Sequence, residues 1–186
     1  FLGPTFQHPM THGADLVVYS ATKYLSGFSD LLGGIVLARD IDLMAQIRGI
    51  RAVLGNILQP DECWMLDGRL PTVSLRMTRQ SKNAQEIAES LTRHPRIEKM
   101  YYPTLFDIPE QVRIRDAQCR QPGAIFSFEL KGGKGAAFDF LRNLRIGKVA
   151  VSLGGVETLV NHPATTTHSE LSAQDKRAFG ISDSLV

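Results

Sequence analysis

A buried strand that ends in an amine and two hydroxyl groups is the feature that most limits what this chain can fold into. The segment GADLVVYS, residues 13–20, reads as a short apolar strand entered through a glycine turn. Ser20, Thr22 and Lys23 then stand within four positions of one another. Two interpretations are open for this strand end: a site that uses the amine, or a surface position at which Lys23 simply reaches solvent.

The rest of the chain alternates between strand and helix patterns. Further strands are predicted at residues 31–39, 96–103 and 124–130, with short strand-like runs at 148–155 and 158–163. Helices are predicted at 40–55, over a long stretch that begins at Pro60 and is kinked or divided at Pro71, and at 135–144 with Phe138 and Leu141 inward. Residues 106–123 read as polar and irregular. This order predicts an α/β chain in which part of an α/β domain, residues 1–85, is followed by a small α+β domain, residues 86–186.

The composition argues against several classes of protein. The net charge is only +2, and no basic run is interleaved with aromatics, so no nucleic-acid partner is expected. No apolar stretch reaches the roughly 18 residues of a membrane span, and the first ten residues lack the pattern of a signal peptide. Cys63 and Cys119 lie far apart and form no CxxC pair, which predicts free thiols in a reducing cytoplasm.

Three other polar clusters carry weaker signals. His162 and His168 match no common zinc spacing and have no cysteine or carboxylate pair nearby in sequence, so no metal site is predicted. The run KGGKG, residues 131–135, lacks the spacing of a phosphate-binding loop and predicts a tight turn. A solvated or interdomain face is expected for three arginines of the long helical stretch: Arg69, Arg76 and Arg79.

Lys23 is the candidate catalytic residue on chemical grounds. A lysine amine in water is protonated and a poor nucleophile, whereas burial favours the neutral form and frees its lone pair. Such an amine can form a Schiff base with an aldehyde, and pyridoxal phosphate (PLP) is the best-known aldehyde cofactor. Ser20 and Thr22 share one face of an extended segment and can donate to the phosphate of that cofactor. The pattern therefore favours a PLP site, with a solvent-facing lysine as the alternative.

Five segments in order resemble one enzyme family. They are GADLVVYSATKYLSGFSDLLGG, GNILQPDECWMLDGRLPTVSLRM, HPRIEKMYYPTL, GAIFSFEL and VSLGGVETLVNHPATTTHS. Together they resemble the Cys/Met metabolism family of PLP-dependent enzymes, which includes cystathionine γ-synthase, cystathionine γ-lyase, methionine γ-lyase and O-acetylhomoserine sulfhydrylase. The resemblance runs over nearly all 186 residues. It implies the second half of a PLP-dependent transferase of fold type I, with a partial large domain and a C-terminal α+β small domain.

The resemblance implies roles for individual residues. Lys23 would attach PLP and would also move the proton of the substrate Cα, while Ser20 and Thr22 would hold the cofactor phosphate. Ser152 matches a serine near the substrate carboxylate, which makes it a substrate-binding residue. Leu153, also assigned to the substrate site, stands where the cystathionine β-lyase branch typically carries tryptophan. This difference favours chemistry at the γ-carbon.

The implied activity is γ-elimination or γ-replacement on sulfur-containing or homoserine-derived amino acids, and methionine γ-lyase is the main interpretation. Cystathionine γ-synthase and cystathionine γ-lyase, the enzymes of transsulfuration, are the alternatives, because Glu157 fits a position common to these branches. O-acetylhomoserine sulfhydrylase and a non-catalytic relic of the fold rank lower. Tyr19 and Phe28 stand where histidine is frequent in the family, and both leave the substrate preference open.

The resemblance also implies residues outside the chain. The aspartate, tyrosines and arginine that complete the PLP site are expected upstream of Phe1, and the arginine that binds the substrate carboxylate is expected after Val186. The chain is thus expected to be a fragment, or the ordered half of a longer chain. The family builds its site across subunits, which implies a homo-oligomer, a tetramer formed as a dimer of dimers.

Overall fold

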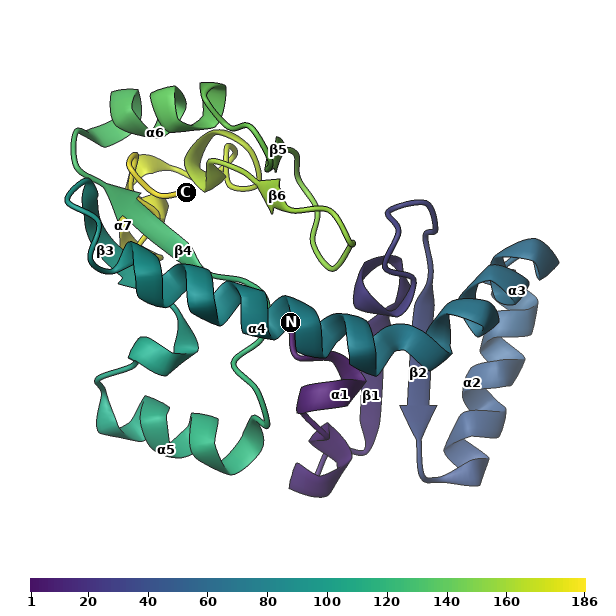
Figure 1. Ribbon diagram of the computed structural model, residues 1–186. Coiled ribbons are helices and arrows are strands. Elements are labelled where there is room, and N and C mark those ends of the chain that lie inside the picture. The colour runs from purple at the N-terminus through teal and green to yellow at the C-terminus, as the bar shows by residue number, and fades with distance from the viewer.

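A long helix, α4 (Val73–Leu91), joins two groups of elements in the computed structural model, which describes residues 1–186 (Figure 1). Before it in sequence come α1 (Gly3–Phe6), β1 (Leu16–Ser20), β2 (Gly34–Ala38), α2 (Ile41–Leu54) and α3 (Pro60–Arg69). After it come β3 (Ile97–Tyr101), α5 (Pro109–Gln118), β4 (Ser127–Leu130), α6 (Gly133–Arg142), β5 (Lys148–Val149), β6 (Leu159–Val160) and α7 (Ala173–Ala178). The chain is therefore the mixed α/β structure that its sequence predicts.

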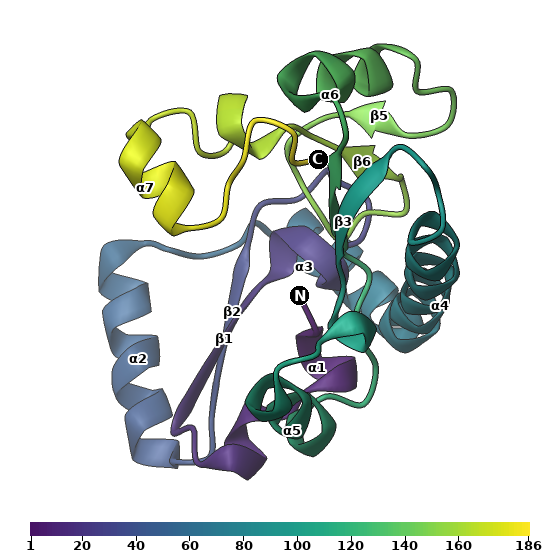
Figure 2. The ribbon, with the colours of Figure 1, turned by 90° about the vertical axis from the view of Figure 1, so that its left-hand side faces the viewer.

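The strand that carries the polar cluster at its end forms an antiparallel pair. β1 pairs with β2 from Leu16 opposite Ala38 to Ser20 opposite Gly34. Both strands begin three residues later than predicted, β1 at Leu16 and β2 at Gly34. β1 ends at Ser20 as predicted, and the chain then enters a single π-helical turn over Ala21–Leu25. Helices α2 and α4 lie on opposite sides of this pair (Figure 2).

The helices before α4 begin and end at recognisable signals. Asp40 caps α2 by accepting from the Leu43 N–H at 2.9 Å, and Gly55 ends it in the left-handed region. A short 3-10 turn over Leu70–Thr72 separates α3 from α4 at Pro71, as predicted, because proline cannot donate to the preceding helical turn. None of the helices combines the length and the apolar character that a membrane crossing requires.

The elements after α4 are built on a small antiparallel sheet. β3 pairs with β4, and the last residues of the chain lie along the other side of β4. There the Phe128 N–H donates to the Val186 carbonyl, and the Val186 N–H donates to the Phe128 carbonyl, both at 2.9 Å. β5 and β6 form a separate, parallel pair of two residues each.

Two local predictions in this region are wrong or incomplete. Residues 109–118 form helix α5 within the segment predicted to be irregular. The apolar spacing that indicates a helix is weak there, and the helix is supported by its N-terminal Pro109 and the Arg113–Glu110 ion pair at 2.6 Å. In α6, Leu141 is buried as predicted, but Phe138 packs its ring beside His162, at 5.2 Å between centroids, rather than in the sheet core.

Buried apolar side chains form separate clusters along α4. The first consists of Phe6, Ala21, Tyr24, Leu25, Leu31, Leu66, Val73 and Met77. The second consists of Phe128, Leu130, Ala137, Leu141 and Val186. α4 contributes Val73 and Met77 to the first cluster, and further along it Ala84 and Ala88 pack with Tyr102 in a third. Because α4 runs through the predicted boundary at residue 85, the division into two domains stays a prediction.

The first cluster contains a polar group without a partner. Tyr24 is only 5% exposed, and its hydroxyl makes no hydrogen bond. Burial raises the pKa of this hydroxyl from 10.0 to about 12, because the phenolate is poorly solvated in an apolar surrounding. The folded pKa lies above the unfolded pKa, so the contribution to stability is fully present below pH 10.0 and is lost as the pH rises through about 12.

We therefore expect Tyr24→Phe to protect the protein against alkaline unfolding. Near neutral pH the variant should unfold with a free energy within about 1 kcal/mol of wild type, since the lost hydroxyl has no partner. Over the whole titration, from well below pH 10.0 to well above about 12, the wild type should lose about 2.7 kcal/mol more than the variant, from two pKa units at about 1.36 kcal/mol each, and about 2 kcal/mol of this loss should fall between pH 10.0 and about 12. Urea titrations at both ends of this range measure the difference. Equal losses in the two proteins would contradict the buried hydroxyl.

Candidate active site

Lys23 occupies the middle of the π-helical turn over residues 21–25, which we call the lysine turn. Its backbone leaves the helical region, with φ −95° and ψ −122°, so the turn is kinked at this residue. The turn is closed by the Ser26 N–H, which donates to the Ala21 carbonyl at 2.9 Å, and by the Gly27 N–H, which donates to the Lys23 carbonyl at 2.8 Å. A short turn fixed at both ends holds the Lys23 side chain in a defined direction.

The Lys23 amine reaches a residue from the far end of the chain. Lys23 Nζ donates to Ser152 Oγ at 3.2 Å, although the two residues are 129 positions apart. Lys23 is half-buried and takes part in none of the ion pairs of the structure. The structure thus brings together the predicted cofactor lysine and the predicted substrate-binding serine.

The two hydroxyls predicted at the cofactor phosphate differ in their surroundings. Ser20 is exposed, and its side chain does not cap the lysine turn that follows it. Thr22 Oγ1 accepts from the Gly33 N–H at 3.0 Å and donates to the Gly33 carbonyl over a longer 3.4 Å. A phosphate oxygen can replace that weak acceptor. Both hydroxyls can therefore donate to an anion beside Lys23, and the residues present fit a PLP phosphate.

Ser152 belongs to a loop, residues 152–157, which we call the serine loop, and this loop lies directly on the lysine turn (Figure 1). Leu153 packs against the first apolar cluster. Gly154 has φ +82°, and a Cβ placed on it would lie 2.5 Å from Tyr24 N and 2.8 Å from Lys23 C. The Val156 N–H donates to the Gly27 carbonyl at 3.0 Å. Only glycine allows this approach of two backbones.

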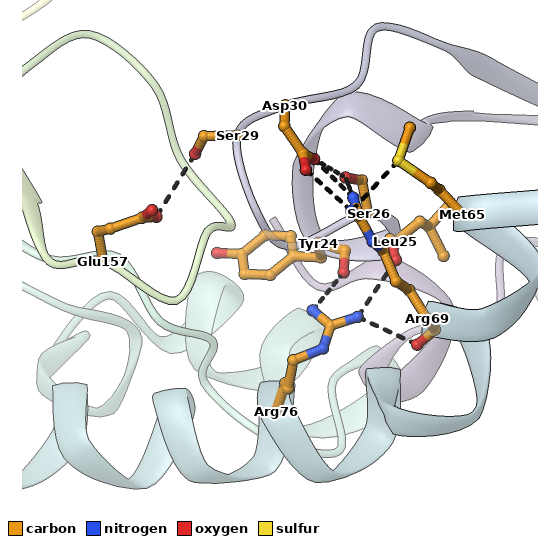
Figure 3. Close-up of polar contacts among 9 residues, drawn as sticks. All are labelled: Tyr24, Leu25, Ser26, Ser29, Asp30, Met65, Arg69, Arg76 and Glu157. Carbon is orange, nitrogen blue, oxygen red and sulfur yellow. Dashed lines mark hydrogen bonds and ion pairs between the residues drawn. The ribbon is translucent and has the colours of Figure 1, made fainter. Parts of the chain in front are cut away.

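Two arginines predicted on a solvated or interdomain face instead bind the lysine turn and the segment that follows it (Figure 3). Arg76 donates to the Tyr24 carbonyl at 2.8 Å and to the Leu25 carbonyl at 3.2 Å. These carbonyls lie at the end of the kinked turn, where helical partners run out. The prediction for Arg76 is wrong because spacing along a helix does not reveal a backbone acceptor on another element.

Arg69 fixes the segment that follows the turn. Its guanidinium contacts Asp30 in a two-pronged ion pair, at 2.6 Å and 2.8 Å, and also donates to Ser26 Oγ at 3.0 Å (Figure 3). The hydrogen bond from Arg69 lowers the pKa of Asp30. Phe28, where the family often has histidine, lies beneath this guanidinium, with the Arg69 Cζ 4.8 Å from its ring centroid.

The other candidate sites take structural roles. His162 is buried, and its two ring nitrogens contact Thr165 Oγ1 and the Asp183 carbonyl, both at 2.9 Å. No group of three or more histidine, cysteine, aspartate or glutamate side chains is placed to hold a metal ion. Residues 131–132 make the predicted turn between β4 and α6, and residues 133–135 already belong to the helix, which begins two residues earlier than predicted.

A comparison with known families decides which enzymes this arrangement belongs with. All of residues 1–186 match the family described as Cys/Met metabolism PLP-dependent enzyme. The chain belongs to this family. Its segments from the lysine turn to the serine loop are therefore those of a PLP-dependent enzyme, and the predicted resemblance is confirmed.

Individual members of the family give the same result. The L-methionine γ-lyase of Fusobacterium nucleatum is 43% identical over 188 residues, which cover 100% of this chain and 47% of that protein. Solved structures of a cystathionine γ-lyase from Micromonospora echinospora and a cystathionine γ-synthase from Xanthomonas oryzae superpose with TM-scores of 0.94 and 0.92, at 39% and 40% identity. Each match covers 100% of this chain and 48% of the solved chain.

Two conclusions follow for the fold and the length. The predicted fold class, the α/β fold of type I PLP-dependent transferases, is confirmed by the solved structures. The chain spans about half the length of the relatives it matches. The roles of Lys23, Ser20, Thr22, Ser152 and Leu153 stay predictions, which the geometry above supports.

We expect Gly154→Ala to lower the free energy of unfolding by more than the cost of placing an alanine in the left-handed backbone region. The left-handed φ costs an alanine about 1–2 kcal/mol, and the clash with the lysine turn adds about 1–3 kcal/mol. Gly55→Ala is the matched control, because Gly55 has φ +77° and no atom within 4 Å of the position that a Cβ would take. Urea unfolding measures both variants. A Gly154→Ala loss no larger than that of Gly55→Ala would mean that the close approach is absent.

Proposed function

We propose that this chain is part of a PLP-dependent enzyme that performs γ-elimination or γ-replacement on sulfur-containing or homoserine-derived amino acids, most like a methionine γ-lyase. The observation that carries the proposal is the contact of Lys23 Nζ with Ser152 Oγ at 3.2 Å. Such chemistry needs a lysine without an ion-pair partner, hydroxyl groups beside it for the cofactor phosphate, and a polar group that faces the lysine amine. Lys23, the pair Ser20 and Thr22, and Ser152 of the serine loop are these parts.

The main substrate class rests on the relatives, among which L-methionine γ-lyases reach 43% identity. Cystathionine γ-synthase and cystathionine γ-lyase are the second candidate, supported by the two solved structures and by the presence of Glu157. Glu157 lies in the serine loop and accepts from Ser29 at 3.5 Å. Turnover assays of the holoenzyme distinguish them. A methionine γ-lyase releases a thiol from methionine alone, whereas a γ-synthase needs an activated homoserine together with cysteine.

The positions of Lys23, Ser152 and Leu153 suggest a separate role for each residue. When bound, PLP supplies an aldehyde and a ring that accepts electrons from the carbon next to the substrate amine. Lys23 holds the cofactor and, once released, takes the proton from the substrate Cα and can return it at a neighbouring carbon. Ser152 accepts from the free amine and keeps it directed toward the serine loop. Leu153, packed on the apolar cluster, anchors the serine loop next to Ser152.

We extend the proposal to assembly and location. A homo-oligomer, a tetramer built as a dimer of dimers, is expected from the family. Arg69 and Arg76 are both engaged within the chain, so they are not free to support this assembly as exposed contact residues. A cytoplasmic location is supported by Cys63 and Cys119, which are both free thiols. Light scattering of the complete protein tests the oligomeric state.

We expect Lys23→Ala to abolish turnover while part of the PLP is still retained through its phosphate. Borohydride reduction of the wild-type holoenzyme, followed by peptide mapping, should place the pyridoxyl label on the peptide that contains Lys23. A label on Lys82 or Lys99 would overturn the assignment. A purified full-length protein with no visible absorbance from PLP would instead favour a non-catalytic relic.

Ser20→Ala and Thr22→Ala should both weaken PLP binding to the apo-protein by about 1.5–3 kcal/mol, because each removes a hydrogen bond to a charged phosphate. Only Thr22→Ala should also lower the free energy of unfolding, since it removes the partner of the Gly33 N–H. Thr22→Ser is the matched control and should retain both properties. The measurements are PLP titrations and urea unfolding. Unchanged PLP affinity in both alanine variants would assign these hydroxyls to the strand end alone.

A further inference from the structure

Helix α4 contacts both halves of the candidate site from one face. Arg76 donates to the carbonyls of Tyr24 and Leu25 in the lysine turn. Gln80 lies four residues later, so the two side chains project from neighbouring turns of the same face. Gln80 Nε2 donates to the Gly155 carbonyl in the serine loop at 2.8 Å. One rigid element thus holds the turn that carries the amine and the loop that carries Ser152.

The serine loop has few other attachments near the lysine turn. The Val156 N–H donates to the Gly27 carbonyl at 3.0 Å. The Ser29–Glu157 contact is exposed and 3.5 Å long, and the Lys23–Ser152 contact is 3.2 Å long. The contact from Gln80 is shorter than either of these side-chain contacts, and it is partly buried. Leu153 packs on the first apolar cluster, but Gly154 and Gly155 add no side chain that packs there, so the position of residues 154–157 depends on these polar contacts.

The Gln80 amide is held in one orientation. Its partner is a carbonyl, so the NH₂ group must face the loop. The opposite atom, Oε1, is buried and has no hydrogen-bond partner. A buried amide oxygen without a partner raises the free energy of the folded state. This unfavourable contribution accompanies the orientation in which the Gln80 NH₂ group donates to the Gly155 carbonyl.

We propose that Gln80 is a positioning residue that, with Arg76 one turn earlier, makes α4 set the separation between the Lys23 amine and the Ser152 hydroxyl. The inference rests on the proposed function, because it takes Ser152 to face the amino-acid substrate. Gln80 is engaged with the backbone of the serine loop. It acts on substrate binding through the serine loop.

The test compares Gln80→Met with Gln85→Met in the holoenzyme. Both changes remove an amide from α4, but Gln85 bonds only Glu89 within the helix. Hydrogen–deuterium exchange should rise about fivefold at the Val156 amide in Gln80→Met, as expected for one lost neutral hydrogen bond. The control should leave this amide unchanged. Gln80→Glu, which keeps the shape but has no donor, should behave like Gln80→Met.

Binding of norleucine, a straight-chain amino acid without a leaving group, tests the consequence for the substrate. Its Kd, followed by the change in PLP absorbance, should rise about fivefold in Gln80→Met. In a Ser152→Ala background the same change should have little effect, because Gln80 acts through Ser152. A purely structural role of Gln80 would give equal effects in both backgrounds.

Two results would overturn the inference: unchanged exchange at Val156 in Gln80→Met, or the same increase in Kd with and without Ser152. If wild type binds no amino acid at all, the proposed function is wrong. The exchange measurement then decides alone whether Gln80 holds the serine loop, since it needs no substrate. Faster exchange supports that hold, and unchanged exchange rejects it.

Discussion

The contact on which the site depends is the approach of Gly154 to the backbone of Lys23 and Tyr24. Gly154 has no side chain, so the serine loop can lie directly against the lysine turn. A Cβ at this position would lie only 2.5 Å from the Tyr24 backbone nitrogen. This contact brings Ser152 within 3.2 Å of the Lys23 amine. It also joins the elements before α4 to those after it, because the loop follows the small sheet in sequence while the turn follows β1.

The lysine turn needs support because it is not a regular helix. Its π-helical geometry and the kink at Lys23 leave the carbonyls of Tyr24 and Leu25 without regular helical partners, and a buried carbonyl needs a donor. Arg76 supplies that donor from α4, at the cost of partial burial, and its pKa is lowered by burial and by the nearby charge of Arg69. The turn that presents the amine is therefore held by the same helix that spans both groups of elements.

Much of this arrangement can be predicted from the sequence, and the rest cannot for physical reasons. The strand before Lys23, the break at Pro71 and the buried Leu141 follow from local patterns, and the structure confirms them. Helix α5 escapes prediction because its apolar spacing is weak, and an N-terminal proline and an exposed Arg113–Glu110 pair do not mark a helix in the sequence. The roles of Arg76 and Gln80 escape it because their partners are backbone carbonyls, which every residue has, so no side-chain pattern marks them.

The distribution of charge around the amine has a chemical consequence. A carboxylate beside a lysine favours the charged form of the amine, which can neither attack an aldehyde nor take a proton. Asp30, which follows the lysine turn, is bound to Arg69 in the two-pronged pair, and Glu157 accepts a hydrogen bond from Ser29. The amine is left with a neutral hydroxyl as its partner. The ion pair that fixes the segment after the turn thus also engages Asp30, the carboxylate closest to Lys23 in sequence.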